Sequence, residues 1–277
     1  MTTHPAMNGI KTEYSADNDW ILARERLALL EGHTDVGTIQ FLNALDVGDG
    51  WRCLEVGGGG GSITEWLCRR VGPAGRVVAT DINTRFLDAL DFGNLEVRVH
   101  NIVADELEQG AFDLVHTRNV LFHLSDRQLA LARMVSALKP GGVLLVEEPD
   151  FSSWVADPRR GDAACSLFLK ALRVASAATG IDIGYGRRLY ADVCALGMID
   201  VEAEGRTRMG RGATPDAEFW RLSYTQIRDR LLGTGQLSPE EFDAFIALFD
   251  DRNFIWMGAV LMAVSGRRPL AWRRAAD

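Results

Sequence analysis

Five consecutive glycines, Gly57 to Gly61, follow an apolar run that contains a single carboxylate, Glu55. Glycine has no side chain, so a ligand can approach its backbone closely. A glycine-rich turn between a strand and a helix presents backbone N–H groups to a bound nucleotide. The run lacks the Gly-Lys-Ser/Thr ending of a phosphate-binding P-loop. It also lacks the third glycine of the dinucleotide fingerprint, because neither Gly nor Ala stands at residues 62–64.

The spacing that does fit is Glu-x-Gly-x-Gly-x-Gly, formed by Glu55, Gly57, Gly59 and Gly61. A carboxylate beside a pyrophosphate would be repelled by it, whereas a carboxylate beside an ammonium group or an ordered water would not. Glu55 therefore favours a cofactor without phosphates. The alternative interpretation of the glycine run is a flexible turn that binds nothing.

Alternating strands and helices must position this loop. Short apolar runs alternate with segments whose apolar residues recur at helical spacing, a pattern typical of a parallel sheet covered by helices on both faces. Ser238 and Glu241 predict a capping box at the start of a late helix, and the segment before residue 32 is expected to lie outside the sheet. Strands are expected over residues 52–56, 76–80, 95–99, 112–116, 142–147, 198–203 and 254–264, and helices over residues 14–31, 62–70, 84–89, 126–138, 163–178, 187–196 and 217–248.

Composition and charge restrict the possible partners. The chain has 277 residues, a formal net charge of -8 and a pI near 5.2, and its arginine pairs are isolated, so no nucleic-acid partner is expected. Four scattered cysteines, together with an N-terminus that is not a signal peptide, favour a reducing, cytoplasmic location. The apolar stretches are too short to span a membrane, and no cluster has metal-ligand spacing, so neither membrane nor metal is expected.

Four motifs, CLEVGGGGGSITEWL, VVATDI, FDLVHTRNVLFHL and LKPGGVLLVEE, follow one another between residues 51 and 150. In this order they resemble the class I S-adenosylmethionine-dependent methyltransferases, in particular their bacterial small-molecule and natural-product branch. The resemblance implies an α/β, Rossmann-like fold with a seven-stranded, mostly parallel sheet whose last strand is antiparallel, and S-adenosylmethionine as the cofactor. It divides the chain into an N-terminal helical segment over the cofactor site (1–50), a cofactor-binding core (51–150) and the remaining sheet with helical substrate-cap insertions (151–277).

The resemblance also implies roles for residues around the glycine run. Gly57, Gly59 and Gly61 would let the chain pass close to the methionine and ribose portions of the cofactor. Asp81 would accept hydrogen bonds from both ribose hydroxyls, and Ile82 would pack on the adenine face. A helix N-terminal charge is the alternative role for Asp81.

Two further pairs take their roles from the same resemblance. Asn101 and Ile102 would lie at the adenine amino edge, although the family usually has Asp where this chain has Asn. Thr117 and Arg118, after the fourth strand, would face the methionine end. An ordinary turn is the alternative role for Asn101.

The N-terminal segment offers a cover for the cofactor. Tyr14, with Arg24 or Arg26, could close over it, and the arginine would then pair with the carboxylate of the cofactor. The same helix could dock instead on a neighbouring subunit and form a homo-oligomer.

Candidate catalytic groups are few, which is consistent with methyl transfer from an activated sulfonium. Such a displacement depends mainly on positioning, and a general base is needed only where the acceptor carries a proton of low acidity. Tyr14 and His123 are the first candidates for catalysis, with Glu148 and Asp150 as further possible bases. His123 either covers the cofactor or packs beside it, whereas His116, inside an apolar strand, is interpreted as a core histidine.

The acceptor is expected to be a small, apolar or aromatic molecule, because aromatic residues gather outside the core sheet. Packing of the insertions against the sheet is the alternative role for these side chains. Two other functions stay open: an NAD(P)-dependent oxidoreductase and a nucleoside-cofactor-binding protein without turnover. The candidate acceptor-binding residues are Trp20, Phe151, Trp154, Tyr185, Trp220 and Tyr224.

Overall fold

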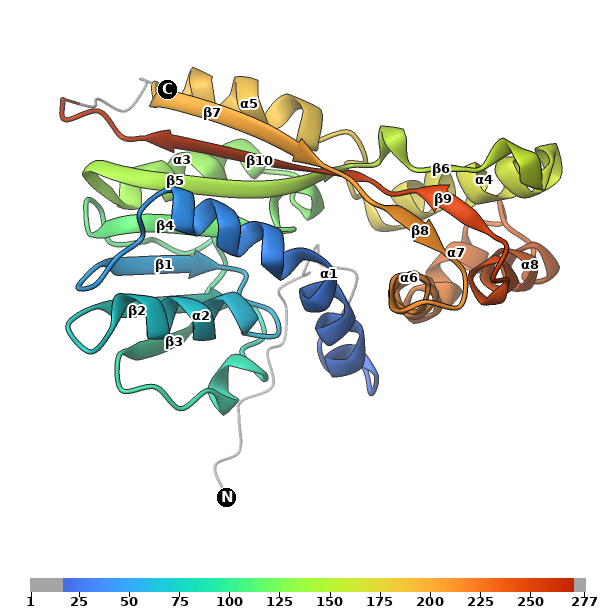
Figure 1. Cartoon of the computed structure of the whole chain (residues 1–277), viewed down its shortest axis with the longest axis horizontal. Coiled ribbons are helices and arrows are strands. Elements are labelled where there is room, and N and C mark those ends of the chain that lie inside the picture. Colours follow the sequence, from blue (N-terminus) through green and yellow to red (C-terminus); the bar gives the residue numbers. More distant parts are fainter. Residues whose placement is uncertain (1–16, 272–277) are drawn as a thin grey trace.

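A seven-stranded sheet and a smaller three-stranded sheet organise the chain (Figure 1). The computed structural model describes residues 17–271; Tyr14 lies outside them. In Figure 1 the larger sheet occupies one side of the molecule, and the smaller sheet with its helices extends from the end where β5, β7 and β10 leave it.

The larger sheet has the strand order β3-β2-β1-β4-β5-β10-β7. The first five strands run parallel, and β10 is antiparallel to both of its neighbours, which confirms the predicted sheet. The order reverses between β1 and β4, so their carboxyl ends open the crevice where sheets of this kind bind ligands. The strands are β1 (Arg52–Val56), β2 (Arg76–Asp81), β3 (Leu95–Val99), β4 (Phe112–Arg118), β5 (Leu138–Asp150), β7 (Ile199–Arg206) and β10 (Val260–Arg267).

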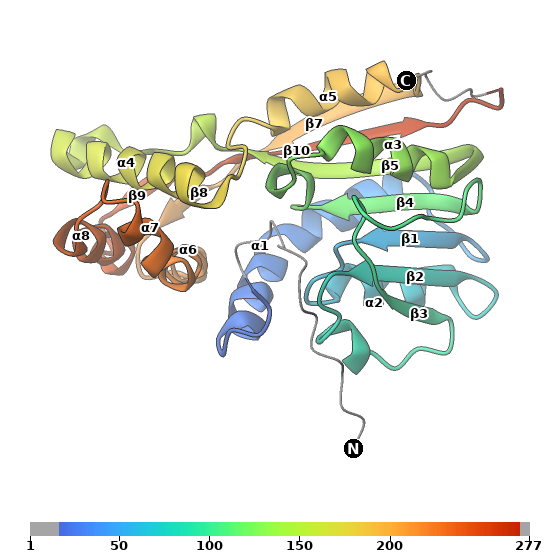
Figure 2. The same ribbon diagram turned by 180° about the vertical axis from the view of Figure 1, so that it is seen from behind.

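Helices cover both faces of this sheet, as predicted. Figure 1 shows α1 (Ala23–Ala44) and α2 (Ser62–Val71) on one face, and the reverse view in Figure 2 shows α3 (Arg127–Ala137) and α5 (Gly186–Ala195) on the other. Neighbouring residues of a strand point to opposite faces. Accordingly, Cys53 packs in one core cluster with Leu67 of α2, whereas Leu54 belongs to a second cluster with Leu131 of α3 and Leu189 of α5.

The smaller sheet and four helices form a separate layer, which we call the cap. Its antiparallel strands lie in the order β6-β9-β8, and a group of buried aromatic side chains packs between them and the helices. Strands of two or three residues are too short to give a periodic pattern, so the sequence did not predict this sheet. The cap comprises β6 (Val155–Ala156), β8 (Met209–Arg211), β9 (Ile255–Met257), α4 (Asp162–Thr179), α6 (Pro215–Gln226), α7 (Arg228–Gly233) and α8 (Pro239–Asp250).

Two further predicted helices, besides the N-terminal one, were wrong in extent. The helix expected over residues 84–89 is only the 3-10 turn η1 (Leu87–Ala89). The helix expected over residues 217–248 is divided into α6, α7 and α8, with a glycine in left-handed conformation at Gly235. The predicted capping box between Ser238 and Glu241 is present at the start of α8.

The final strand was also predicted as one element, and it is two. The chain leaves the smaller sheet after β9 and enters the larger sheet at β10, with residues 258–259 between them. A Cβ atom at Gly258 would lie 3.0 Å from the carbonyl oxygen of Arg208, so the two segments cross closely at this point.

The N-terminal helix differs most from the prediction. It begins at Ala23 and continues to Ala44, well beyond residue 31, and its second half packs on the sheet through Leu42. Gly32 and Gly37 are weak helix formers, so intrinsic preference hides the continuation that tertiary packing enforces.

Helix α5 lies so close to β5 that no side chain fits at its first residue. A Cβ atom at Gly186 would lie 2.7 Å from the carbonyl oxygen of Glu148 and 2.8 Å from the carbonyl carbon of Pro149. We expect Gly186→Ala to lower the free energy of unfolding by about 1–3 kcal/mol, because the backbone must shift to relieve the overlap. Urea denaturation measures this difference. Gly184→Ala, which would meet only the flexible Arg187 side chain at 3.4 Å, is the control, and equal stability of the two variants would contradict the packing argument.

Candidate active site

One cavity of about 630 Å³ opens at the carboxyl ends of β1, β2 and β4, between the sheet, α1 and the cap. It brings together residues from all three predicted segments of the chain. Those of the sequence-predicted residues that line it are Arg26, Glu55, Gly57, Gly59, Asp81, Ile82, Asn101, Ile102, Arg118, His123, Phe151, Trp220 and Tyr224.

The glycine loop turns sharply at the end of β1. The backbone N–H groups of Gly57 and Gly58 both donate to the carbonyl of Thr80 on β2, at 2.7 and 3.1 Å. Gly57 and Gly59 have φ angles of 73° and 55°, in the left-handed region where side chains are strained. A Cβ atom at Gly57 would also lie 2.3 Å from Cγ2 of Val120. This position therefore requires glycine both for its conformation and for its contact.

Asp81 closes one side of the loop. Its carboxylate accepts hydrogen bonds from the backbone N–H of Gly59 and of Asn83, each at 3.0 Å. Burial raises the pKa of this carboxyl, and the backbone donors oppose that change. The side chain lies at the cavity wall with its orientation fixed by both strand-end loops.

Asn101 forms a turn at the end of β3. Its side-chain oxygen accepts a hydrogen bond from the backbone N–H of Val103 at 2.9 Å, and its own N–H donates to Asp105. Because a backbone N–H can only donate, the oxygen of Asn101 must face Val103. Asn101 therefore both forms a turn and lines the cavity.

A chain of buried polar groups runs from the glycine loop across the sheet beneath α1. Glu55 accepts a hydrogen bond from Thr64, and its other oxygen lies 3.6 Å from Nδ1 of His116. Nε2 of His116 lies 3.4 Å from Glu147, whose other oxygen accepts a hydrogen bond from Arg206 at 2.7 Å. His116 and Glu147 are fully buried.

The two carboxylates decide the charge of His116. Burial alone would lower the pKa of this imidazole, but contacts with Glu147 and Glu55 outweigh burial and raise it. Burial likewise opposes ionisation of Glu147, whereas His116 and Arg118 lower the pKa of that carboxyl. His116 therefore compensates buried charge within the core and does not line the cavity.

Arg118, at the end of β4, joins the sheet to α1. Its guanidinium donates hydrogen bonds to Thr38 and Asp35, both at 2.8 Å. The residue lines the cavity, but these two contacts already engage its charge.

His123 lines the cavity on the 3-10 turn η2 (Leu121–His123), beside Phe122. Burial, reinforced by the charge of Arg26, lowers the pKa of this imidazole to about 3. The ring is therefore neutral at physiological pH and is a weak base.

The two carboxylates proposed as further bases lie outside the cavity. Glu148 is fully buried and accepts hydrogen bonds from the backbone N–H groups of residues 120–122 at 2.7–3.1 Å. Burial raises the pKa of Glu148 to about 7 despite these donors. Asp150 accepts a hydrogen bond from Ser152 and pairs with Arg187 at 2.8 Å. Both carboxylates accept hydrogen bonds from the backbone, and neither lines the cavity.

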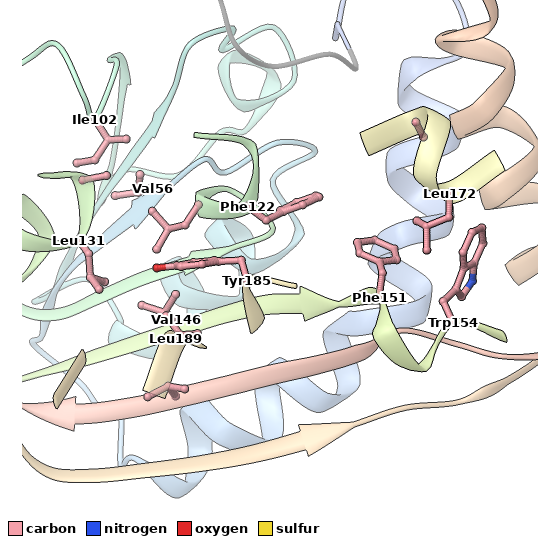
Figure 3. Packing of buried hydrophobic residues seen from close by; sticks show 14 of the residues in the cluster. Val56, Ile102, Phe122, Leu131, Val146, Phe151, Trp154, Leu172, Tyr185 and Leu189 are labelled. Carbon is pink, nitrogen blue, oxygen red and sulfur yellow. The ribbon is translucent and has the colours of Figure 1, made fainter. Parts of the chain in front are cut away.

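Two of the predicted aromatic residues belong to the core instead of the cavity wall. Figure 3 shows Tyr185 between the sheet and α3, next to Val146 and Leu131, and Trp154 beside Leu172. Both side chains are fully buried, and neither lines the cavity. Bulk and position outside the core sheet could not distinguish packing aromatics from exposed ones.

Four other predicted residues also lie outside the cavity wall. Arg24 donates to the carbonyl of Gly60 at 2.9 Å from outside the loop. Thr117 is buried and donates to the carbonyl of Val56. Gly61 is the N-cap residue of α2, and Trp20 precedes α1.

Apart from Arg26, sequence reasoning missed the face of α1 and the start of α6 that line the cavity. Arg26, Leu30, His33 and Gly37 recur every three or four residues, so they share one face of the helix. This spacing was readable, but the predicted helix stopped at residue 31. Asp216, in the first turn of α6, gave no signal of its own.

Comparison with known proteins identifies the domain that holds the glycine loop. Residues 54–144 match the family described as a methyltransferase domain. Over 117 residues the chain is 38% identical to the ubiquinone/menaquinone biosynthesis C-methyltransferase UbiE of Vibrio vulnificus, across 39% of this chain and 44% of that protein. The chain spans less than half the length of the curated relatives it matches.

Solved structures share the fold. The chain aligns with phosphoethanolamine N-methyltransferase 2 of Haemonchus contortus in complex with S-adenosyl-L-methionine, with a TM-score of 0.50, 18% identity and coverage of 93% of this chain and 56% of that one. It also aligns with the YcgJ protein of Bacillus subtilis, with a TM-score of 0.53, 13% identity and coverage of 82% and 97%. Within residues 17–271, no helix is long and apolar enough to cross a membrane.

The buried polar groups around His116 make the free energy of unfolding depend on pH. Because the pKa of His116 is raised in the folded state, its contribution is full below the ordinary value of 6.5 and is lost as the pH rises through the raised value. We expect the stability difference between the wild-type protein and His116→Gln to be largest below that value and to shrink in alkaline solution. Urea denaturation across this pH range measures it.

His100 provides the matched control. Burial lowers the pKa of His100, so the contribution of this residue is lost as the pH falls, and the difference for His100→Gln should change in the opposite direction. Parallel pH profiles for the two variants would contradict the assigned charge of His116.

Proposed function

We propose that the chain is a class I S-adenosylmethionine-dependent methyltransferase that methylates a small, apolar or aromatic acceptor, because residues 54–144 match the methyltransferase-domain family. The observation that carries this proposal is the continuity of one cavity. The glycine loop and Asp81 line one part of it, and the aromatic side chains of Phe151, Trp220 and Tyr224 line another.

The residues at the glycine loop fit a phosphate-free nucleoside linked to an amino acid. Bound S-adenosylmethionine supplies a methyl group that its sulfonium already activates. Asp81, held by two backbone donors, would present its free lone pairs to the ribose hydroxyls. Glu55, nine-tenths buried and lining the cavity, would attract the ammonium group. Ile82 and Ile102 would enclose the adenine.

Asn101 suits the adenine edge in a particular way. Its oxygen already accepts from Val103, which leaves the amide nitrogen as the group able to donate. A ring nitrogen of adenine is an acceptor, so Asn101 would serve that position. This contact differs from acceptance of the exocyclic amino group by the Asp that the family usually has.

Acceleration would come mainly from positioning. The cap and α1 enclose the cavity beside the glycine loop, so an acceptor held there is close to the methyl donor and is shielded from bulk water. Such placement supplies on the order of 7–11 kcal/mol in well-oriented reactions. His123, kept neutral by burial, would contribute shape and contact at this point and not charge.

Calorimetry with S-adenosylhomocysteine tests the cofactor assignment. We expect the wild-type protein to bind it and Asp81→Ala to bind it about 1–3 kcal/mol more weakly, because a charged hydrogen-bond acceptor is lost. Asp91→Ala, which removes an exposed carboxylate nearby, is the control and should bind as the wild-type protein does.

NADH is titrated in parallel, because an oxidoreductase on a similar sheet would bind it. Binding of NADH without binding of S-adenosylhomocysteine would overturn the proposal. Incubation with radiolabelled S-adenosylmethionine and a metabolite extract then tests turnover; cofactor binding without any labelled product would indicate a binding protein.

A further inference from the structure

A histidine and an aspartate from different parts of the chain meet in the wall of the cavity. Nδ1 of His33, on α1, lies 2.7 Å from Oδ1 of Asp216, in the first turn of α6. Both residues line the same cavity as Glu55 and Asp81. Their side chains are 31% and 28% exposed, so the pair is accessible to a ligand and to solvent.

The contact fixes which nitrogen of His33 can take up a proton. The carboxylate of Asp216 is ionised, because the hydrogen bond with His33 lowers its pKa and the charge of Arg208 adds to the effect. Its position in the first turn of a helix favours the negative charge as well. An ionised carboxylate can only accept, so Nδ1 carries the hydrogen and Nε2 has a free lone pair. Within residues 17–271, Nε2 makes no hydrogen bond.

The other titratable groups of the cavity are poorly suited to the role of a base. Burial lowers the pKa of His123 and of His100, so both imidazoles are weak bases. Glu31 pairs with Arg24, and Asp81 accepts two backbone hydrogen bonds at the glycine loop. Glu55 is engaged by Thr64 and lies next to His116 in the core. The His33–Asp216 pair is therefore the one arrangement, within the described part of the cavity, in which a carboxylate holds an imidazole by one nitrogen and leaves the other nitrogen without a hydrogen bond.

An aromatic wall adjoins the pair. Phe219 and Trp220 follow Asp216 by three and four residues, so they lie on the same face of α6, and both line the cavity. The ring of Trp220 lies 5.9 Å from that of Phe151, at the end of β5. A flat, apolar ring bound against these side chains would carry its polar substituent toward His33.

We propose that the His33–Asp216 pair is the general base of this site and that the acceptor carries an ionisable hydroxyl on an aromatic ring. The inference rests on the proposed function. The hydroxyl proton passes to Nε2 of His33, and the electron pair of the O–H bond stays on the oxygen, which becomes the nucleophile. The imidazolium is stabilised by Asp216 and returns its proton to solvent.

The probe for this step is 4-nitrophenol, an aromatic hydroxyl compound whose ionised form absorbs visible light. It is titrated into the protein saturated with S-adenosylhomocysteine, and the pKa of the bound probe is read from the phenolate absorbance. In the wild-type protein we expect this pKa to be about 1–3 pH units below that of the free probe, because a proton on His33 places a cation beside the oxyanion.

Two variants separate proton uptake from a structural role. In His33→Asn, the amide nitrogen replaces Nδ1 and still donates to Asp216, but nothing can take up the proton, so the pKa of the bound probe should return to the free value or rise above it. Asp216→Asn should produce a smaller change in the same direction. Glu218→Gln, which removes the ion pair with Arg221 on the same helix outside the cavity, is the control and should behave as the wild-type protein does.

The proposal is overturned if the wild-type protein binds the probe as the neutral phenol or not at all, or if His33→Asn keeps the lowered pKa. In the latter case Arg208 would be the group that stabilises the phenolate. Calorimetry with S-adenosylhomocysteine distinguishes this failure from failure of the proposed function. Variants that bind it normally leave the methyltransferase assignment intact. A wild-type protein that does not bind it would contradict both the general base and the methyltransferase function.

Discussion

Two buried carboxylates near the centre of the sheet, Glu55 and Glu147, require compensating partners from the surrounding residues. An uncompensated charge at such a site costs several kcal/mol, so each needs partners that the sheet alone cannot supply. His116 joins the two, and Arg206 reaches Glu147 from β7. Helix α1 crosses directly above with Gly37, where a Cβ atom would lie 1.8 Å from the guanidinium of Arg206. The electrostatics of the core therefore fix the path of α1, and that path decides which face of the helix borders the cavity.

The larger sheet was predictable because its signals are local. Apolar runs, helical spacing and the glycine loop each occupy a few adjacent residues, and the strand over residues 52–56 has the bounds that the sequence predicted. The cap was not predictable in the same way. Its strands of two or three residues become strands only through pairing with distant segments, as Ala156 does with Trp256.

The candidate site likewise has a part that could be predicted from local sequence and a part that could not. Gly57, Asp81 and Asn101 stand at strand ends, where the order of strands already indicates a ligand. His33 and Asp216 are separated by 183 residues and have no common motif, so only the folded chain brings them within hydrogen-bond distance. Both also lie outside residues 54–144, the segment that matches the methyltransferase family. The glycine loop and Asp81 thus lie within the segment that matches the family, whereas the His33–Asp216 pair lies in sequence that the match does not cover.

The junction at Gly258 has a mechanical consequence. Four chain segments connect the larger sheet and its helices with the cap. Three of them lie side by side, leading from β5 to β6, from β7 to β8 and from β9 to β10, and the fourth leads from α4 to α5. The carbonyl of Gly258 accepts hydrogen bonds from Ser153 and Thr207, which belong to the other two segments, at 2.9 and 3.0 Å. Because these three segments are hydrogen-bonded to one another at Gly258, they resist twisting and sliding more than they resist bending. Movement of the cap relative to the larger sheet would therefore have to bend all three segments together at Gly258.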